Sequence, residues 1–160
     1  MLIVFGLMVL GAVAQQGLPA VDVKSLNGAV SSTAGWTNDG KPMVISFWAT
    51  WCKPCIKELN NISELYPDWQ EETGVKIIAL SIDDARTSLG VRSLVQGLNW
   101  EYEVFIDENG DFKRAMNVIN IPHTFLLDGS GKVVYQHTSY ADGDELYLYD
   151  HIKALVEDAE

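Results

Sequence analysis

The chain has 160 residues, and 22 Asp and Glu residues against 11 Lys and Arg residues give it a net charge of −11. This length suits one domain with a core of its own, and an apolar content of 48% excludes a disordered chain. The acidic balance argues against a nucleic acid as partner, because phosphate binding needs a basic surface.

The N-terminal stretch is apolar, and the first charged residue of the chain is Asp22. Residues 1–14 are too few for a membrane-spanning helix, which needs about 20 residues. They match the hydrophobic part of a signal peptide that ends in the small-x-small site AVA at 12–14. We therefore expect a signal peptide over 1–14, cleaved to leave a domain over 15–160. Because no Lys or Arg precedes the apolar run, an anchoring role stays open. Either way, the sequence predicts an extracytoplasmic protein, periplasmic or membrane-associated on the outer side.

Strand and helix patterns alternate along the rest of the chain. Short apolar or alternating runs predict strands at 43–48, 75–82, 102–106, 124–127 and 133–137. Apolar residues at helical spacing predict helices at 53–73, 84–98 and 111–117, and a last helix from about 143. Turn residues stand at 27–28, 38–40 and 109–110, and the run DGSG at 128–131 predicts a hairpin. This order indicates an α/β domain with parallel pairing in its first part and an antiparallel hairpin at its end.

The two cysteines of the chain, Cys52 and Cys55, both lie in the run FWATWCKPC. A disulfide that closes so short a loop stabilises the fold little, so these sulfurs are expected to be reactive. Cys52 falls between a strand and the start of a helix, where the partial positive charge favours thiolate over thiol. Cys55 lies one turn inside that helix and should be more buried. The spacing therefore predicts that Cys52 attacks a substrate disulfide and that Cys55 resolves the mixed disulfide.

Other uses of a CxxC motif fit the sequence less well. A zinc site needs a second pair of ligands, and His123, His137 and His151 are scattered without ligand spacing. A haem attachment site needs His directly after the second cysteine, where Ile56 stands. We predict no metal and no cofactor. His137 and His151 are interpreted as ordinary strand or surface residues, while a substrate contact stays open for His123, which follows a proline.

Four features together resemble the thioredoxin superfamily, and most of all its extracytoplasmic branch of TlpA- and ResA-like thiol–disulfide oxidoreductases. These are WCKPC after an apolar strand, Glu58 three residues beyond Cys55, Ile121-Pro122 before a strand, and an extra helix and strand between 82 and 111. The resemblance implies a thioredoxin fold: a central mixed sheet flanked by helices, with a helix–strand insertion before the strand that follows a cis-proline.

The resemblance also implies roles for individual residues. Pro122 would be the cis-proline, packed against the sulfurs, and the backbone of Ile121 would pair with an extended substrate segment. Typical thioredoxins carry a buried Asp six residues before the first cysteine, where this chain has Ser46. Glu58 would replace that Asp and manage the proton on Cys55.

The residues beside the two sulfurs would contact the substrate. Trp51 would offer an exposed apolar surface for partner chains, since an aromatic ring buries a large area on docking. Lys53 would add a positive charge close to Cys52, and Pro54 would stiffen the loop between the cysteines.

We therefore expect an enzyme that reduces protein disulfides by dithiol–disulfide exchange. Its substrates would be protein thiols and disulfides, with a membrane thiol carrier as electron donor and a possible place in cytochrome c maturation. The alternatives are a disulfide oxidase or isomerase on the same fold and, from another class, a copper-binding chaperone. The sequence leaves the oligomeric state open.

Overall fold

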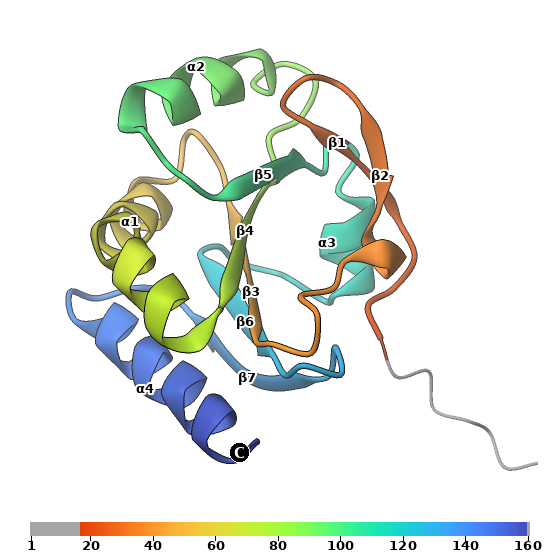
Figure 1. The fold of residues 1–160 in the computed structure, drawn as a ribbon. Coiled ribbons are helices and arrows are strands. Elements are labelled where there is room, and N and C mark those ends of the chain that lie inside the picture. The colour runs from red at the N-terminus through yellow and green to blue at the C-terminus, as the bar shows by residue number, and fades with distance from the viewer. Residues whose placement is uncertain (1–16, 160) are drawn as a thin grey trace, which may run out of the picture.

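The computed structural model describes residues 17–159, so the expected signal segment at 1–14 lies outside the described residues. Within 17–159, one seven-stranded sheet is flanked by four α-helices (Figure 1). The strands are β1 (Asp22–Ser25), β2 (Val30–Ser32), β3 (Met43–Trp48), β4 (Lys76–Ser81), β5 (Glu103–Ile106), β6 (His123–Leu127) and β7 (Val133–Thr138). The helices are α1 (Lys53–Thr73), α2 (Leu89–Leu98), α3 (Asp111–Ala115) and α4 (Asp144–Glu157).

The sheet is mixed and has the strand order β2-β1-β5-β4-β3-β6-β7. The strands β3, β4 and β5 run parallel to one another, whereas β6 is antiparallel to β3 and forms a hairpin with β7. In the register, Ile45 on the interior strand β3 pairs with Ile78 on one side and with Phe125 on the other. The predicted parallel first part and closing antiparallel hairpin are both confirmed.

Each face of the sheet carries its own apolar cluster. On one face lie α1, α2 and α4, with α1 packed on α4, and on the other face α3 and the segment before β1 cover the sheet (Figure 1). The fully buried members of the first cluster include Leu59, Ile62, Leu148 and Ile152, and Phe112 is the buried aromatic residue of α3 in the second. Burial of each such side chain contributes about 1.5–3 kcal/mol, so these two clusters fix the helices to the sheet.

Two parts of the fold differ from the sequence expectations. The β1–β2 hairpin was not predicted beyond its turn, because its two strands are only 4 and 3 residues long. The helix expected over 84–98 begins at Leu89 instead. The reason is local: the Asp84 side chain accepts a hydrogen bond from the Arg86 amide at 2.9 Å. Such a side-chain turn competes with helical hydrogen bonding.

The two ends of the strands lie beside different parts of the chain. The carboxyl ends of β3 and β4 and the start of β6 meet at one end of the sheet, because β6 runs antiparallel to β3. At the opposite end, Gly17 and Ala159, the two ends of the described chain, both line hollows beside Asp128. No helix in 17–159 is long and apolar enough to cross a membrane.

Candidate active site

The two cysteines lie at the carboxyl end of β3, where the chain enters α1. They form a disulfide with a Cα–Cα distance of 5.3 Å. Cys52 is the N-cap residue of α1, and its carbonyl accepts the first helical hydrogen bond from Ile56 at 3.1 Å. Cys52 is 6% exposed and Cys55 is fully buried. The predicted difference in burial is confirmed, so a reagent from solution reaches Cys52 before Cys55.

The start of α1 favours an ionised sulfur at Cys52 once the disulfide is opened. The first turn of α1 holds no acidic residue, and Lys53 and Pro54 in that turn are exposed. The partial positive charge of the helix N-terminus is therefore not offset by a carboxylate in the same turn, and this charge stabilises a thiolate.

Glu58 lies on α1, three residues after Cys55, and is completely buried. Its Oε1 is 2.7 Å from Nε2 of His137 and 3.2 Å from the hydroxyl of Thr124. The Thr124 oxygen is in turn 3.1 Å from the hydroxyl of Ser46. Through Thr124, Glu58 is thus linked to Ser46, which stands where typical thioredoxins carry the buried Asp. Its Oε2 is buried and has no hydrogen-bond partner among residues 17–159.

The interpretation of His137 as an ordinary strand or surface histidine is corrected by its contact with Glu58. Its side chain is 15% exposed and points from β7 to Glu58, on the same strand face as Val133 and Tyr135. The alternating pattern of β7 was the available signal, since residues two apart share a face. The sequence alone did not reveal which helix covers that face.

Asp83 is a second buried carboxylate, at the carboxyl end of β4, and it was not expected from the sequence. It accepts hydrogen bonds from the Thr50 amide at 2.9 Å, the Thr50 hydroxyl at 2.6 Å and the Ser81 hydroxyl at 2.7 Å. Thr50 belongs to the loop between β3 and Cys52, so Asp83 ties this loop to the end of β4. Its place just after an apolar strand was a usable signal, because polar groups gather at the carboxyl ends of parallel strands.

The remaining expected site residues come directly before Cys52 or directly before β6. The Ile121–Pro122 peptide bond is cis, as expected. Ile121 is half-buried, while the Trp51 side chain is 61% exposed. His123 is not a surface residue: it is 8% exposed, stacks on Phe125 at 4.3 Å and has Nε2 2.9 Å from Gln136 Oε1.

Two tyrosines add to the electrostatics around Glu58. Burial, then the neighbouring Tyr66, then the negative charge of Glu58 raise the pKa of Tyr102, whose hydroxyl donates to the Leu59 carbonyl at 2.6 Å. Burial, together with Asp144 and Glu58, also raises the pKa of Tyr135. Both phenols therefore stay neutral at neutral pH.

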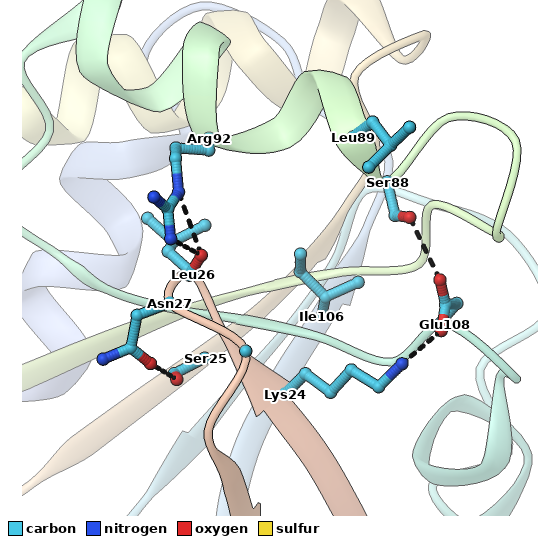
Figure 2. A pocket seen from close by; sticks show the side chains of 10 residues that line it. Lys24, Ser25, Leu26, Asn27, Ser88, Leu89, Arg92, Ile106 and Glu108 are labelled. Atoms are coloured by element: carbon cyan, nitrogen blue, oxygen red, sulfur yellow. Dashed lines mark hydrogen bonds and ion pairs between the residues drawn. The ribbon is translucent and has the colours of Figure 1, made fainter.

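A pocket of about 390 Å³ lies away from the disulfide, between the β1–β2 turn and the start of α2 (Figure 2). Its charged groups are already paired. Glu108 bonds Lys24 at 2.6 Å and Ser88 at 3.1 Å, and these two donors lower its pKa, while Arg92 donates to the Leu26 carbonyl at 3.0 Å. No expected site residue lines this pocket. Among residues 17–159, no group of three or more His, Cys, Asp or Glu side chains could hold a metal ion.

The fold and the disulfide at a helix N-terminus define a thioredoxin-fold protein with a CxxC motif. The model of the AhpC/TSA family matches residues 14–136, so the chain belongs to this family. The recognised TlpA/ResA-like branch is supported by similarity to curated thiol-disulfide oxidoreductases called ResA. The one from Bacillus thuringiensis subsp. konkukian is 41% identical over 110 residues, 69% of this chain and 62% of that protein. The one from Oceanobacillus iheyensis is 30% identical over 136 residues, 82% of this chain and 69% of that protein.

Solved structures agree with the fold. A thioredoxin-like protein from Porphyromonas gingivalis is 52% identical, with a TM-score of 0.80 and coverage of 89% of this chain and 94% of that one. StoA from Bacillus subtilis is 21% identical, with a TM-score of 0.65 and coverage of 84% and 98%. The chain spans less than two thirds of the first of the curated relatives described above.

Proposed function

We propose that this protein is a thiol–disulfide oxidoreductase that reduces disulfides in other proteins. The observation that carries the proposal is the arrangement of the two sulfurs: Cys52 is at the start of α1, and the fully buried Cys55 is bonded to it. The ResA relatives are named for this activity. Cys52 and Cys55 would be the reacting groups, and Glu58 would exchange the proton of Cys55.

The reaction would proceed in two displacements. In the reduced protein, the Cys52 thiolate attacks one sulfur of a substrate disulfide, forms a mixed disulfide and releases the other substrate sulfur as a thiolate. Cys55 then loses its proton and attacks the Cys52 sulfur. The Cys52–Cys55 disulfide forms, the mixed disulfide breaks, and the second substrate sulfur leaves with the electron pair. A thiol donor must afterwards reduce the pair again.

The residues around the disulfide would bind the substrate chain. Trp51 would offer an exposed apolar surface, and the backbone of Ile121, which precedes the cis-proline Pro122, would pair with an extended substrate segment. Lys53 and Pro54 would contact the same segment from the first turn of α1.

The setting of the activity is also part of the proposal. Residues 1–14 would serve as a signal peptide and 15–160 as one thioredoxin-like domain outside the cytoplasm, where disulfides form and a dedicated reductant has substrates. A membrane thiol carrier would supply electrons. Protein thiols awaiting haem attachment in cytochrome c maturation would be among the targets.

Insulin reduction with a thiol donor tests the activity. We expect wild-type turnover, no turnover in Cys52→Ser, and target proteins held on Cys52 in Cys55→Ser as mixed disulfides. Turnover that survives in Cys52→Ser would overturn the mechanism. The reduction potential decides the direction: a value near about −270 mV fits a reductant, and about −180 mV or higher fits an oxidase or isomerase.

A further inference from the structure

The buried Glu58 carboxylate is bound asymmetrically by its neighbours. Oε1 is 2.7 Å from His137 Nε2 and 3.2 Å from the Thr124 hydroxyl, whereas Oε2 has no hydrogen-bond partner within 17–159. A buried carboxylate that lacks donors is costly as an ion. His137 provides the shorter of the two contacts to this carboxyl group.

Cys55 and Glu58 lie on the same face of α1. Residues three apart on a helix are neighbours on one face, and Cys55 and Glu58 are both fully buried on α1. Because His137 and Thr124 contact Oε1, Oε2 is the carboxylate oxygen that is left without a partner among residues 17–159.

We propose that His137 is a positioning residue of the resolving step, which donates from Nε2 to Glu58 Oε1 and so holds the carboxylate with Oε2 free to take the proton of Cys55. This inference rests on the proposed function. In balance, the Cys55 thiol and the Glu58 carboxylate become a thiolate and a carboxylic acid. The thiolate displaces the bound thiolate from Cys52, and Glu58 later returns its proton to solvent.

The polar and titratable groups around the Glu58 carboxylate come from the strands, from α1 and from two tyrosines. The strands contribute His137, Thr124 and Ser46, and α1 contributes Cys55. The two tyrosines whose pKa values its charge raises, Tyr102 and Tyr135, stay neutral below pH 10. These two phenols therefore take no part in a proton transfer between Cys55 and Glu58 near neutral pH.

The test separates the two displacements with one small probe. Reduced protein is mixed with dithio-bis-nitrobenzoate, and the coloured nitrothiobenzoate anion is followed in a stopped-flow instrument between about pH 5 and 10. A first, bimolecular phase reports attack by Cys52. A second, unimolecular phase reports displacement by Cys55. Wild type is compared with His137→Phe, His137→Gln and Glu58→Gln. His151→Phe is the matched control, since His151 stacks on Tyr135 at 3.9 Å and donates from Nδ1 to the Tyr147 carbonyl instead of to Glu58.

In Glu58→Gln we expect the second phase to slow about 100-fold at pH 7, the scale of a lost general base. His137→Phe should slow it about tenfold or more and move its rise toward pH 8.5, the ordinary range of a thiol. His137→Gln keeps an N–H donor and should restore most of the rate. The first phase should be unchanged in all three variants, and His151→Phe should match wild type in both phases.

Three results would overturn the role of His137. They are a second phase in His137→Phe with the wild-type rate and pH profile, an equal loss in His137→Gln, and a loss of the same size when His137→Phe is added to Glu58→Gln. If His137→Phe does not fold, His137→Asn replaces it, because the shorter side chain does not reach Oε1. Failure of the proposed function looks different: the wild-type protein then gives no first phase, or releases nitrothiobenzoate equally in Cys55→Ser.

Discussion

The Asp83 carboxylate holds the loop that leads into Cys52, and its removal is expected to loosen that loop. Asp83 is fully buried and accepts three hydrogen bonds, two of them from Thr50 and one from Ser81. A hydrogen bond to a charged group contributes about 1.5–3 kcal/mol, and donors left unpaired in the interior add a penalty. Water that enters the space left by the carboxylate can bond the freed donors and so recover part of the lost free energy. We therefore expect Asp83→Ala to lower the free energy of unfolding by about 3–5 kcal/mol.

Two milder changes dissect that value. In Asp83→Asn the amide oxygen can still accept from the Thr50 amide and from Ser81, and the Thr50 hydroxyl can accept instead of donate. This variant should lose about 1–2 kcal/mol. Thr50→Val removes one hydroxyl donor and should lose about 1 kcal/mol. Because both changes alter the same contact between the Thr50 hydroxyl and Asp83 Oδ1 at 2.6 Å, the double variant should lose clearly less than the sum.

Urea unfolding of the oxidised proteins, followed by tryptophan fluorescence, measures these differences. The same variants mixed with dithio-bis-nitrobenzoate after reduction should show a slower first phase, because a mobile Thr50 no longer fixes the backbone before Cys52. The reasoning is refuted if Asp83→Ala costs less than about 1 kcal/mol, or if the effects of Asp83→Asn and Thr50→Val are additive within about 0.5 kcal/mol.

Three further outcomes are expected. A Cβ on Gly129 would lie 1.9 Å from the Gly40 carbonyl oxygen, so Gly129→Ala should lower the free energy of unfolding in urea by about 3 kcal/mol. On α2, a Cβ on Gly97 would meet nothing within 4 Å, so Gly97→Ala should raise that free energy by about 0.5–1 kcal/mol. Equal effects at the two glycines would contradict the clash. Burial and the Glu145 carboxylate raise the pKa of Tyr140 to about 12, above its unfolded value near 10. The contribution of the neutral Tyr140 side chain to the free energy of unfolding is therefore complete below pH 10 and is lost as the pH rises toward 12. Tyr140→Phe should therefore lose less stability across that window and lack a tyrosinate absorbance step near pH 12; an unchanged titration would count against it. Trp51→Ala should change the unfolding free energy by less than about 0.5 kcal/mol yet raise the KM for insulin several-fold, and an unaltered KM would exclude Trp51 from docking.

The elements that the sequence predicted well are those whose cause is local. The strand β3 is a continuous apolar run, and α1 ends where Gly74 takes a left-handed conformation with φ of 68°. Such a position needs no information from distant residues, because glycine alone adopts it without a steric cost. The superfamily motif around Cys52 and Cys55 likewise lies within a few residues.

The features that escaped the sequence depend on distant partners. The short strand β1 is held by its pairing with β5, about 80 positions further along the chain, and its own four residues carry little signal. His137 pairs with a carboxylate 79 residues away, and Asp83 with a loop 33 residues away. An alternating pattern indicates which face of a strand is buried, but the packing of α1 on that face decides that a histidine there meets Glu58.

The placement of both described chain ends beside Asp128 has a practical consequence for handling the protein. The strand β3 separates them from the disulfide by about 17 Å, the length of a six-residue strand. A biotin, a fluorophore or a fusion partner attached next to Gly17 or Ala159 therefore leaves the opposite rim of the sheet open. A sensor chip loaded in this way would present Cys52 to the flowing solution in a uniform orientation.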